Sequence, residues 1–395
     1  MNDNKKIEEI LNRGVEEVFI FDDLKEKLNS GKKLRVKLGV DPTGPKIHIG
    51  RAVVLKKLGA FQDLGHKIIL IVGDFTAQIG DSSDKFEKRP MLTKKEIKKN
   101  LKDYKKQLGK IINLSKAEFK FNSKWLKKLK FQEIAELAES FSVQQMSNRR
   151  NFKERIEKGQ DISLREFLYP LMQGYDSVIV EADVEIGGSD QLFNLMAGRT
   201  IQKKYNQKEQ NILTVQMLEG TDGEKMSTTK GNVINITDEP NEIFGKVMSL
   251  KDGLITKYFT LCTSLDLSEI EKIKKGIENK EINPRDAKKK LAKEIVAIYH
   301  DKNKAEKAEE YFVKTFSKKE IPEEIQTTKT LSGEKLSEAL LRQKMISSMS
   351  EFKRLVDSDS IMNMSENEKI KEYNYVVKKT SVFKIGKHRF IKIEV

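Results

Sequence analysis

The sequence predicts an α/β fold: a parallel sheet interrupted by a helical insertion, followed by an all-α domain and a small α+β domain. Two apolar runs, at 34–40 and 67–74, flank a segment with helical spacing of its apolar residues. After residue 232 the pattern becomes helical, and short helix-like and strand-like segments fill 333–395. The length of 395 residues also favours several domains, since one domain usually has roughly 100 to 200 residues.

The first recognisable unit is β–α–β. An apolar strand at 34–40 is followed by a loop rich in Gly and Pro, by a helix at 49–64 and by the strand at 67–74. Parallel strands joined in this way need a right-handed crossover. A further strand is expected at 177–186. These elements predict a Rossmann-like nucleotide-binding domain over 1–235.

The loop after the first strand reads Gly39-Val-Asp-Pro-Thr-Gly-Pro-Lys-Ile-His-Ile-Gly-Arg51. A strand end, a glycine-containing loop and a helix start bring backbone N–H groups and the positive end of the helix dipole to one point, which favours anions. Gly50 allows a nucleotide to approach the backbone closely. His48 can donate a hydrogen bond to a phosphate group, although a histidine here also suits a helix cap. The loop is a candidate phosphate site.

The predicted insertion, at about 85–170, begins with a strongly basic segment. Between Lys85 and Lys130 there are 17 Lys or Arg against 4 Asp or Glu, within a chain of net charge +15. Clustered cations bind nucleic acids through phosphate contacts. The segment therefore favours a nucleic-acid partner, with an AT-rich genome as the alternative explanation for the many lysines.

Polar side chains share one face of a predicted helix in Tyr169-Pro-Leu-Met-Gln-Gly-Tyr-Asp176. Tyr169, Gln173 and Asp176 are spaced by four and three residues, so they project in one direction. Gly187-Gly-Ser-Asp-Gln191 ends a strand, where pocket residues of α/β sheets gather. A carboxylate such as Asp176 is a strong acceptor for a phenol hydroxyl, and such a pocket rejects an analogue lacking the hydroxyl by ~10⁴ to 10⁵.

A second flexible, cationic segment, Lys225-Met-Ser-Thr-Thr-Lys-Gly-Asn232, follows the last predicted strand. It resembles the KMSKS loop of class I aminoacyl-tRNA synthetases, and the loop that contains His48 resembles their HIGH signature. Two positions differ: Arg51 replaces the final histidine of HIGH, and Thr228 replaces the second lysine of KMSKS. Arg51 keeps a long donor, and Lys230 offers the displaced charge two residues later. The resemblance implies catalytic roles for His48, Arg51, Lys225, Lys230 and Thr43.

The segments around Tyr169 and Gly187 are similar to the tyrosine-binding motifs of bacterial tyrosyl-tRNA synthetases. The resemblance implies that Asp176 binds the phenol, Asp190 the ribose of the adenylate, and Asp81 the α-amino group. The tyrosine-binding set that it implies is Thr76, Asp81, Tyr169, Gln173, Asp176 and Gln191. The ATP-binding set is Gly39, Asp41, His48, Gly50, Asp190, Lys225, Met226 and Ser227.

One pocket position departs from many bacterial members of this family. They have a second tyrosine two residues before the first glycine of the loop, where it shares the phenol contact; this chain has Lys37. Lysine before Leu-Gly-Val-Asp-Pro-Thr resembles another bacterial subfamily of the same enzyme. The difference therefore predicts a branch of the family with the same activity.

The remaining chain is expected to form an α-helical anticodon-binding domain at 236–320, a linker at 321–332 and an RNA-binding domain at 333–395. Helices are predicted from Pro240 to Cys262, from Leu267 to Gly276, and after the cap Asn283. The last domain resembles the small RNA-binding domain named after ribosomal protein S-four. Phe383 and Phe390, interleaved with cations, are expected to stack on bases. The predicted tRNA-binding residues are Lys378, Lys379, Lys384, Lys387 and Arg389.

Composition limits the remaining possibilities. One cysteine, Cys262, excludes an intrachain disulfide, and the absence of a long apolar stretch or signal peptide predicts a cytoplasmic protein without a membrane partner. Four scattered histidines and that cysteine predict no protein-bound metal site. The expected cofactor is ATP with Mg²⁺.

The expected partners are L-tyrosine, ATP and tRNA(Tyr), with a homodimer implied by the family, its seam at about 131–141. Three alternatives remain open: a tryptophanyl-tRNA synthetase, a catalytically inactive paralogue that only binds RNA, and a small nucleotidyltransferase. Asp176 and Gln173 argue against an indole substrate, because an indole needs no acidic phenol partner. Arg51 and Thr228 are the observations that favour the inactive paralogue.

Overall fold

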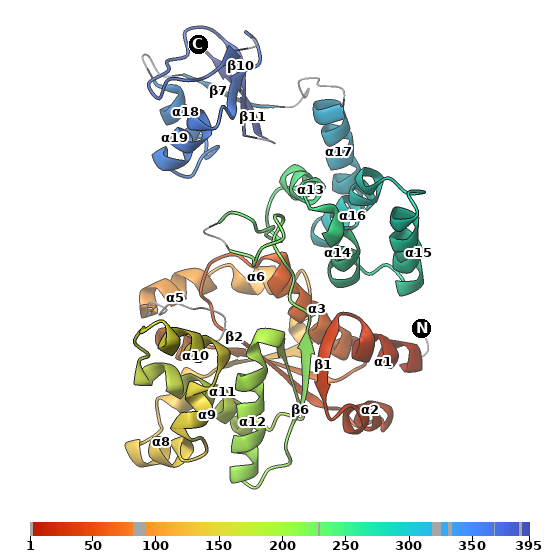
Figure 1. Cartoon of the computed structure of the whole chain (residues 1–395), viewed down its shortest axis with the longest axis vertical. Coiled ribbons are helices and arrows are strands. Elements are labelled where there is room, and N and C mark those ends of the chain that lie inside the picture. The colour runs from red at the N-terminus through yellow and green to blue at the C-terminus, as the bar shows by residue number, and fades with distance from the viewer. Residues whose placement is uncertain are drawn as a thin grey trace. The chain divides into compact units, whose positions relative to one another are not determined.

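The computed structural model describes residues 3–81, 92–227, 230–317, 325–330, 334–366, 368–386 and 389–395. The chain divides into two compact units. The first contains the residues up to Glu239 together with Lys246–Asp301, and the second contains Pro240–Gly245 and Lys302–Val395. Figure 1 shows the elements of each unit in chain order.

The first unit is built on a six-stranded sheet in the order β1-β6-β5-β2-β3-β4. All neighbouring strands are parallel except the edge strand β1, which is antiparallel to β6. The predicted β–α–β unit is confirmed, with β2 and β3 in register from Arg35 opposite Lys67 to Val40 opposite Val72. The strands are β1 (Val15–Phe19), β2 (Arg35–Val40), β3 (Lys67–Val72), β4 (Ala117–Phe121), β5 (Val184–Gly188) and β6 (Asn211–Val215).

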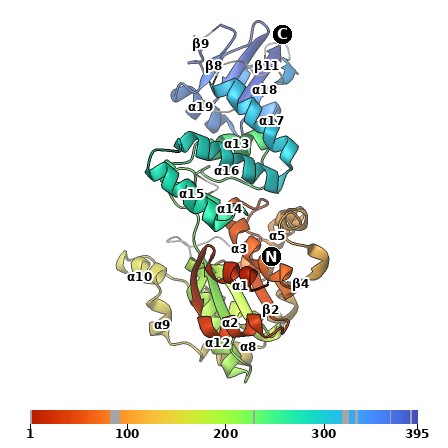
Figure 2. The same cartoon turned by 90° about the vertical axis from the view of Figure 1, so that its right-hand side faces the viewer.

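Helices surround this sheet, and Figure 2 shows α1, α2 and α12 around the strands. The residues of β3 from Ile68 to Val72 are buried, which explains their continuous apolar run. The helices before residue 239 are α1 (Asp3–Asn12), α2 (Phe21–Asn29), α3 (Ile49–Asp63), α4 (Thr76–Ile79), α5 (Lys94–Leu101), α6 (Tyr104–Leu108), α7 (Ser123–Leu126), α8 (Phe131–Ala138), α9 (Val143–Ser147), α10 (Arg150–Glu157), α11 (Leu164–Ile179) and α12 (Leu192–Lys204), with short 3₁₀ turns η1 (Leu114–Lys116) and η2 (Ser189–Gln191).

The predicted strand at 177–186 was wrong over its first half. Helix α11 continues to Ile179, and the strand β5 begins only at Val184. A capping box of Ser163 and Glu166 starts this helix, and its face at Leu171 and Val178 packs into an apolar cluster. Tertiary packing therefore outweighs the strand preference of the β-branched residues near the helix end.

Strands β1, β4 and β6 were not predicted. Strand β4 lies within the segment expected to be a helical insertion, and all five of its residues are only partly buried. It is an edge strand paired with β3, and its sequence Ala-Glu-Phe-Lys-Phe does alternate apolar and charged residues, but the alternation is only five residues long and lies within a segment interpreted as helical. The insertion is therefore helical only in part.

The helices that follow in the first unit are α14 (Ile255–Cys262), α15 (Leu267–Glu278) and α16 (Pro284–Tyr299). The single helix predicted from Pro240 to Cys262 was wrong: α13 (Pro240–Met248) ends before the 3₁₀ turn η3 (Asp252–Leu254), where Gly253 weakens helix formation. The start of α16 is confirmed, because the Asn283 side chain accepts a hydrogen bond from the Arg285 N–H and Pro284 is the first helical residue.

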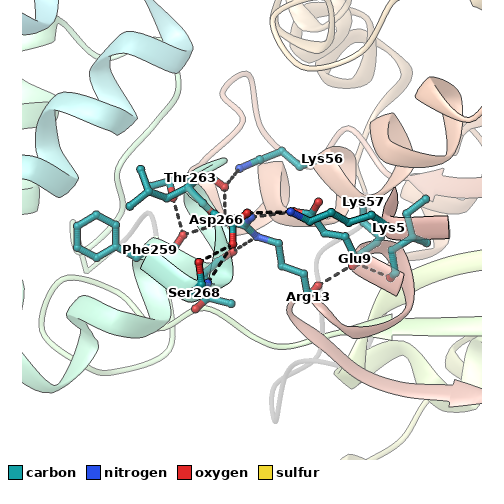
Figure 3. A network of polar contacts seen from close by, with 12 residues as sticks. Lys5, Glu9, Arg13, Lys56, Lys57, Phe259, Thr263, Asp266 and Ser268 are labelled. Carbon is teal, nitrogen blue, oxygen red and sulfur yellow. Dashed lines mark hydrogen bonds and ion pairs between the residues drawn. The ribbon is translucent and has the colours of Figure 1, made fainter. Parts of the chain in front are cut away.

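Three cations connect helix ends in this unit: two of them join α1 and α3 to the end of α14, and the third joins α3 to the end of α1 (Figure 3). The Arg13 guanidinium donates to the carbonyls of Thr260, Leu265 and Thr263 at 2.8–2.9 Å, and Lys56 donates to the Thr263 carbonyl at 2.8 Å. Lys57 donates to the carbonyls of Ile10 and Arg13. Cations at helix C-termini satisfy carbonyls that lack intrahelical partners. Burial lowers the pKa of Lys56 to about 8 and that of Lys57 to about 7.

The second unit contains a helical part, α17 (Lys302–Phe312) with the π-helical turn η4 (Val313–Ser317), and an α+β part. The α+β part has a sheet in the order β7-β11-β10-β8-β9, which confirms the predicted fold class of this region. Its elements are β7 (Gln326–Lys329), α18 (Leu336–Arg342), α19 (Met349–Asp357), β8 (Ile361–Asn363), β9 (Glu368–Lys369), β10 (Ser381–Ile385) and β11 (Arg389–Glu394).

Two sequence predictions for this unit differ from the structure. Part of the segment expected to be a linker, Gln326–Lys329, is strand β7, which pairs in parallel with β11. The stacking role predicted for Phe383 and Phe390 was wrong, since these side chains are 0% and 5% exposed. Phe383 belongs to the apolar core between the sheet and helices α18 and α19. In a strand with one buried face, alternate apolar residues form the core.

Candidate functional site

A cavity of about 280 Å³ lies where the parallel strands of the first unit end. Its walls include the last residues of β2, β3, β5 and β6, which is where ligands bind in open α/β sheets. Most of the predicted site residues line it: Gly39, Asp41, Thr43, His48, Gly50, Arg51, Thr76, Asp81, Tyr169, Gln173, Asp176, Asp190, Gln191, Lys225 and Met226. Ser227 and Lys230 are described but do not line it.

A larger hollow of about 740 Å³ lies beside Arg13, Lys56 and Lys57. The ammonium and guanidinium groups of these residues bind backbone carbonyls there, so they already hold the fold together. The smaller cavity is the candidate functional site, because segments far apart in the sequence bring their polar side chains into it.

His48 caps helix α3 at the cavity wall. Its Nδ1 accepts a hydrogen bond from the Arg51 N–H at 3.4 Å, which leaves Nε2 as the ring atom for a ligand. Burial, with a contribution from the nearby Arg51 charge, lowers the pKa of His48 to about 4. The ring is therefore neutral at pH 7, and it can act as a hydrogen-bond donor at the positive end of the helix dipole.

The Arg51 side chain is held in the same wall. Its Nη2 donates to the Thr43 hydroxyl at 2.6 Å, and its Nη1 lies 3.5 Å from the Tyr104 hydroxyl. The predicted catalytic residues Thr43 and Arg51 thus contact each other directly. Tyr104, in α6, was not predicted, because no recognisable string surrounds it.

The loop that contains His48 is joined by backbone hydrogen bonds to the segment just after the Lys225–Asn232 loop. The Ile49 N–H donates to the Ile234 carbonyl at 2.9 Å, and the Ile236 N–H donates to the Ile47 carbonyl at 3.0 Å. A Cβ atom on Gly50 would lie 2.9 Å from the Met226 sulfur, so the glycine lets the second loop close against the first. His48 and Lys225 therefore line one cavity, as the sequence predicted.

Asn232 holds the second loop in shape. Its amide nitrogen donates to Asp222 at 2.8 Å and to the Lys225 carbonyl at 3.1 Å, and its oxygen accepts from the Ser227 N–H at 2.7 Å. The side chain is 5% exposed. Sequence reasoning quoted this residue but gave it no role, because its contacts depend on how the loop folds.

For the amino-acid activation with ATP that the sequence predicts, Asn232→Ala is expected to lower kcat by on the order of tenfold while KM for the amino acid stays nearly unchanged, because Lys225 loses its fixed position. Steady-state kinetics measure both constants, and Glu224→Ala, at an exposed residue outside the predicted catalytic set, serves as a control that leaves these side-chain hydrogen bonds intact. A variant Asn232→Ala with normal kcat would show that the loop keeps its geometry without these contacts.

Asp176 also lines this cavity, and its side chain is buried. One oxygen accepts from Trp125 Nε1 at 2.7 Å and the other accepts from Asn122 Nδ2 at 3.2 Å. Burial raises the pKa of this carboxyl to about 7, while Lys37 and the two hydrogen bonds act in the opposite direction. Asn122 and Trp125 were missed, because they follow an unpredicted strand.

Asp41 connects cavity residues that come from separate segments of the chain. Its oxygens accept from the Thr76 hydroxyl at 2.7 Å and the Tyr169 hydroxyl at 3.1 Å. Asn122 donates to the Thr76 hydroxyl at 3.0 Å, so the chain of contacts reaches Asp176. Gly73 is needed beside it, since a Cβ atom there would lie 1.9 Å from Asp41 Oδ1.

The predicted amino-group residues also meet. Gln191 donates to Asp81 at 2.9 Å, and Asn194 donates to both Asp81 and Gln191 at 3.2–3.3 Å. Arg149 donates to Asn194 at 3.1 Å and stacks on Phe193. Asp81 is thus an anchored anion, suited to an ammonium group.

The predicted tRNA-binding residues belong to the second unit. Lys379 pairs with Glu366, Arg389 binds Glu351 at 3.0 Å and the Met345 carbonyl, and Lys384 lies over the Phe390 ring. Lys387 lies outside the described residues. Arg389 thus connects β11 to α19.

The described ranges contain neither a metal-binding cluster nor a helix that could span a membrane. No three His, Cys, Asp or Glu side chains come together there to hold a metal ion. No helix in the described part of the chain is long and apolar enough to span a bilayer.

Comparison with known proteins places this geometry in context. Residues 29–317 match the family described as tRNA synthetases class I (W and Y). The chain is 50% identical to the tyrosine–tRNA ligase of Carboxydothermus hydrogenoformans and 48% identical to that of Thermotoga maritima. Each alignment covers 80% of this chain, with 78% of the first relative and 79% of the second.

Solved structures resemble the fold at lower identity. A tyrosyl-tRNA synthetase from Archaeoglobus fulgidus, complexed with L-tyrosine, gives a TM-score of 0.62 at 22% identity, covering 78% of this chain and 100% of that one. A C-terminally truncated mitochondrial tyrosyl-tRNA synthetase from Aspergillus nidulans gives 0.65 at 23% identity, covering 79% and 94%. These likenesses support the fold.

Proposed function

The chain belongs to the class I tRNA synthetases for tryptophan and tyrosine, and we infer from its curated relatives and its cavity that it is a tyrosine–tRNA ligase. It activates L-tyrosine with ATP, releases pyrophosphate and transfers the tyrosyl group to tRNA. The observation that supports the assignment is that Asp176, His48 and Lys225 line one cavity.

In the activation step the tyrosine carboxylate attacks the α-phosphorus of ATP, and pyrophosphate leaves. The carboxylate is already a nucleophile at pH 7, so no general base is needed. Rate must come from positioning and from stabilising the charge of the phosphates. We assign this task to the neutral His48 ring, the Arg51–Thr43 pair and Lys225, with Lys230 as a further cation of the same loop.

Mg²⁺ is proposed to arrive with ATP, on the phosphate oxygens. The described residues contain no ligand cluster of their own for it, and the carboxylates of Asp41 and Asp81 already accept hydrogen bonds from Tyr169 and Gln191. A metal ion on the phosphates neutralises charge as pyrophosphate leaves.

Amino-acid selection follows from the buried acid. Asp176 offers an acceptor for the tyrosine hydroxyl, and Asp81 with Gln191, Tyr169 and Gln173 lies near the place for the amino group. Phenylalanine brings no hydroxyl, so the buried Asp176 would keep only its bonds from Trp125 and Asn122, and the acceptor site meant for the phenol would stay unfilled, which costs binding energy. The tryptophan alternative is not favoured, because the relatives at 48–50% identity are tyrosine–tRNA ligases.

The assignment is tested by exchange of labelled pyrophosphate into ATP. Exchange is expected with L-tyrosine, and not with tryptophan or phenylalanine at the same concentration. Exchange driven by tryptophan would contradict the tyrosine pocket. RNA binding without any exchange would instead support the inactive paralogue.

The remaining partners are proposals that rest on surface features. Phe131 is 86% exposed, Leu164 80% and Val143 73%, all in the insertion, and such apolar side chains suit a homodimer seam. We propose that the helices at 236–320 read the anticodon region and that the domain at 333–395 binds tRNA through Lys378, Lys379, Lys384, Lys387 and Arg389. A cytoplasmic location fits the single reduced cysteine.

A further inference from the structure

Lys37 lies beneath the tyrosine pocket and does not line it. Its fully buried ammonium group contacts three acceptors: the Glu185 carboxylate at 2.8 Å, the Gln173 carbonyl at 2.8 Å and the Ser177 hydroxyl at 2.7 Å. An ammonium group has three N–H donors, so each finds a partner. Lys37 therefore does not take over the phenol contact of a pocket tyrosine.

Glu185 completes a closed set of contacts. One of its oxygens also accepts from the Gln173 amide at 3.1 Å, and the other accepts from the Ser177 hydroxyl at 3.1 Å and from the Gln210 amide. Lys37 and Glu185 are both 0% exposed. A buried ion pair is often no more stabilising than apolar residues of the same size. Stability alone therefore does not explain this pair.

The pair contacts α11 on both sides of Asp176, at Gln173 three residues before it and at Ser177 one residue after it. Lys37 holds the Gln173 backbone and Glu185 holds its side-chain nitrogen, so the amide oxygen of Gln173 is the atom left for the cavity. Both charges also bind Ser177, one residue after Asp176. The pair thus fixes the rotation of α11 about its axis at the point where tyrosine binds.

We propose that Lys37 and Glu185 are positioning residues for tyrosine: they lock α11 so that Gln173 turns its amide oxygen to the tyrosine ammonium group and Asp176 stays in place for the phenol. This inference rests on the proposed function. It assigns a role of its own to the lysine that stands where other family members have a pocket tyrosine.

Lys37 and Glu185 act on the pKa of Asp176 in opposite directions. Burial raises the pKa of Asp176, Lys37 from β2 lowers it, and Glu185 from β5 raises it. The other contacts of Asp176, from Trp125 and Asn122, come from neutral donors. Asp41 is the next acid, connected through Thr76 and Asn122. Removing Lys37 and removing Glu185 must therefore move the ionisation of Asp176 in opposite directions.

The experiment compares Lys37→Met, Glu185→Gln and the double variant with the wild-type chain, in tyrosine-dependent pyrophosphate exchange from about pH 5.5 to 9. Lys37→Met is expected to move the midpoint of the acid limb of kcat/KM upward by about one pH unit, and Glu185→Gln to move it downward. At about pH 7, Lys37→Met should raise KM for tyrosine on the order of tenfold and KM for ATP less than about twofold. The double variant should return toward the wild-type midpoint.

Circular dichroism establishes that each variant is folded. Each single variant leaves one buried charge without its partner, whereas the double variant leaves neither, so the double variant still decides the question if a single variant fails to fold. An unchanged midpoint in folded Glu185→Gln, or equal increases of KM for tyrosine and ATP in the double variant, would overturn the proposal. A wild-type chain without tyrosine-dependent exchange would instead defeat the proposed function.

Discussion

Replacing Asp176 with Asn is expected to lower kcat/KM for tyrosine by on the order of 10² to 10³ in pyrophosphate exchange and to reduce the preference for tyrosine over phenylalanine by a similar factor. The substitution keeps the shape of the side chain and an oxygen that can accept from Trp125 Nε1. It removes the charged acceptor that the phenol needs. The loss should therefore fall on tyrosine, while KM for ATP stays nearly constant.

The same residue gives the wild-type enzyme its pH dependence. The pKa of Asp176 is about 7, so kcat/KM for tyrosine should rise with pH through about that value and become flat above it. His48 does not contribute a limb in this range, because its pKa is about 4. In Asp176→Asn the rise should disappear.

As pH rises, the contribution of Asp176 to the free energy of unfolding should fall while kcat/KM for tyrosine rises. The pKa of Asp176 lies above its ordinary value of 3.8, so the folded chain binds one more proton than the unfolded chain between about pH 4 and 7. The contribution of Asp176 to the free energy of unfolding therefore falls as pH rises through this window. Asp176→Asn should lack that fall and unfold at pH 8 no more easily than wild type. A marked loss of stability together with activity would identify Asp176 as a structural acid.

Local sequence strings were sufficient to locate most of the cavity. The residues from Gly39 to Arg51 and from Tyr169 to Asp176 each lie within one short segment, so their relative placement follows from the geometry of one loop or one helix. Their convergence on one cavity needed only the rule that ligands bind at the carboxyl ends of parallel strands.

Residues whose role depends on tertiary contact could not be found in this way. Trp125 and Asn122 reach Asp176 only because β4 joins the edge of the sheet beside β3, and its five-residue alternation was interpreted as part of a helical insertion. Lys37 was noticed as a departure, but its ion pair with Glu185 spans strands that are far apart in the sequence. Phe383 and Phe390 show the opposite error: an aromatic side chain between cations looks like a base-stacking surface until the strand face is known.

Two tasks are combined at His48, and they can be separated by substitution. The ring caps α3 through Nδ1, and its other nitrogen is available to a phosphate of ATP. His48→Ala should remove both tasks, lowering kcat for activation by on the order of 10² to 10³ and the free energy of unfolding by about 1 kcal/mol.

His48→Ser is the decisive comparison, because serine is a strong helix cap whose short side chain cannot reach the phosphates. Its free energy of unfolding should match that of the wild type, as measured by urea denaturation, while its kcat remains as low as that of His48→Ala. A serine variant with nearly normal kcat would mean that the histidine serves the helix alone. The burden of stabilising the leaving pyrophosphate would then fall on the Arg51–Thr43 pair and on Lys225, which line the same wall of the cavity.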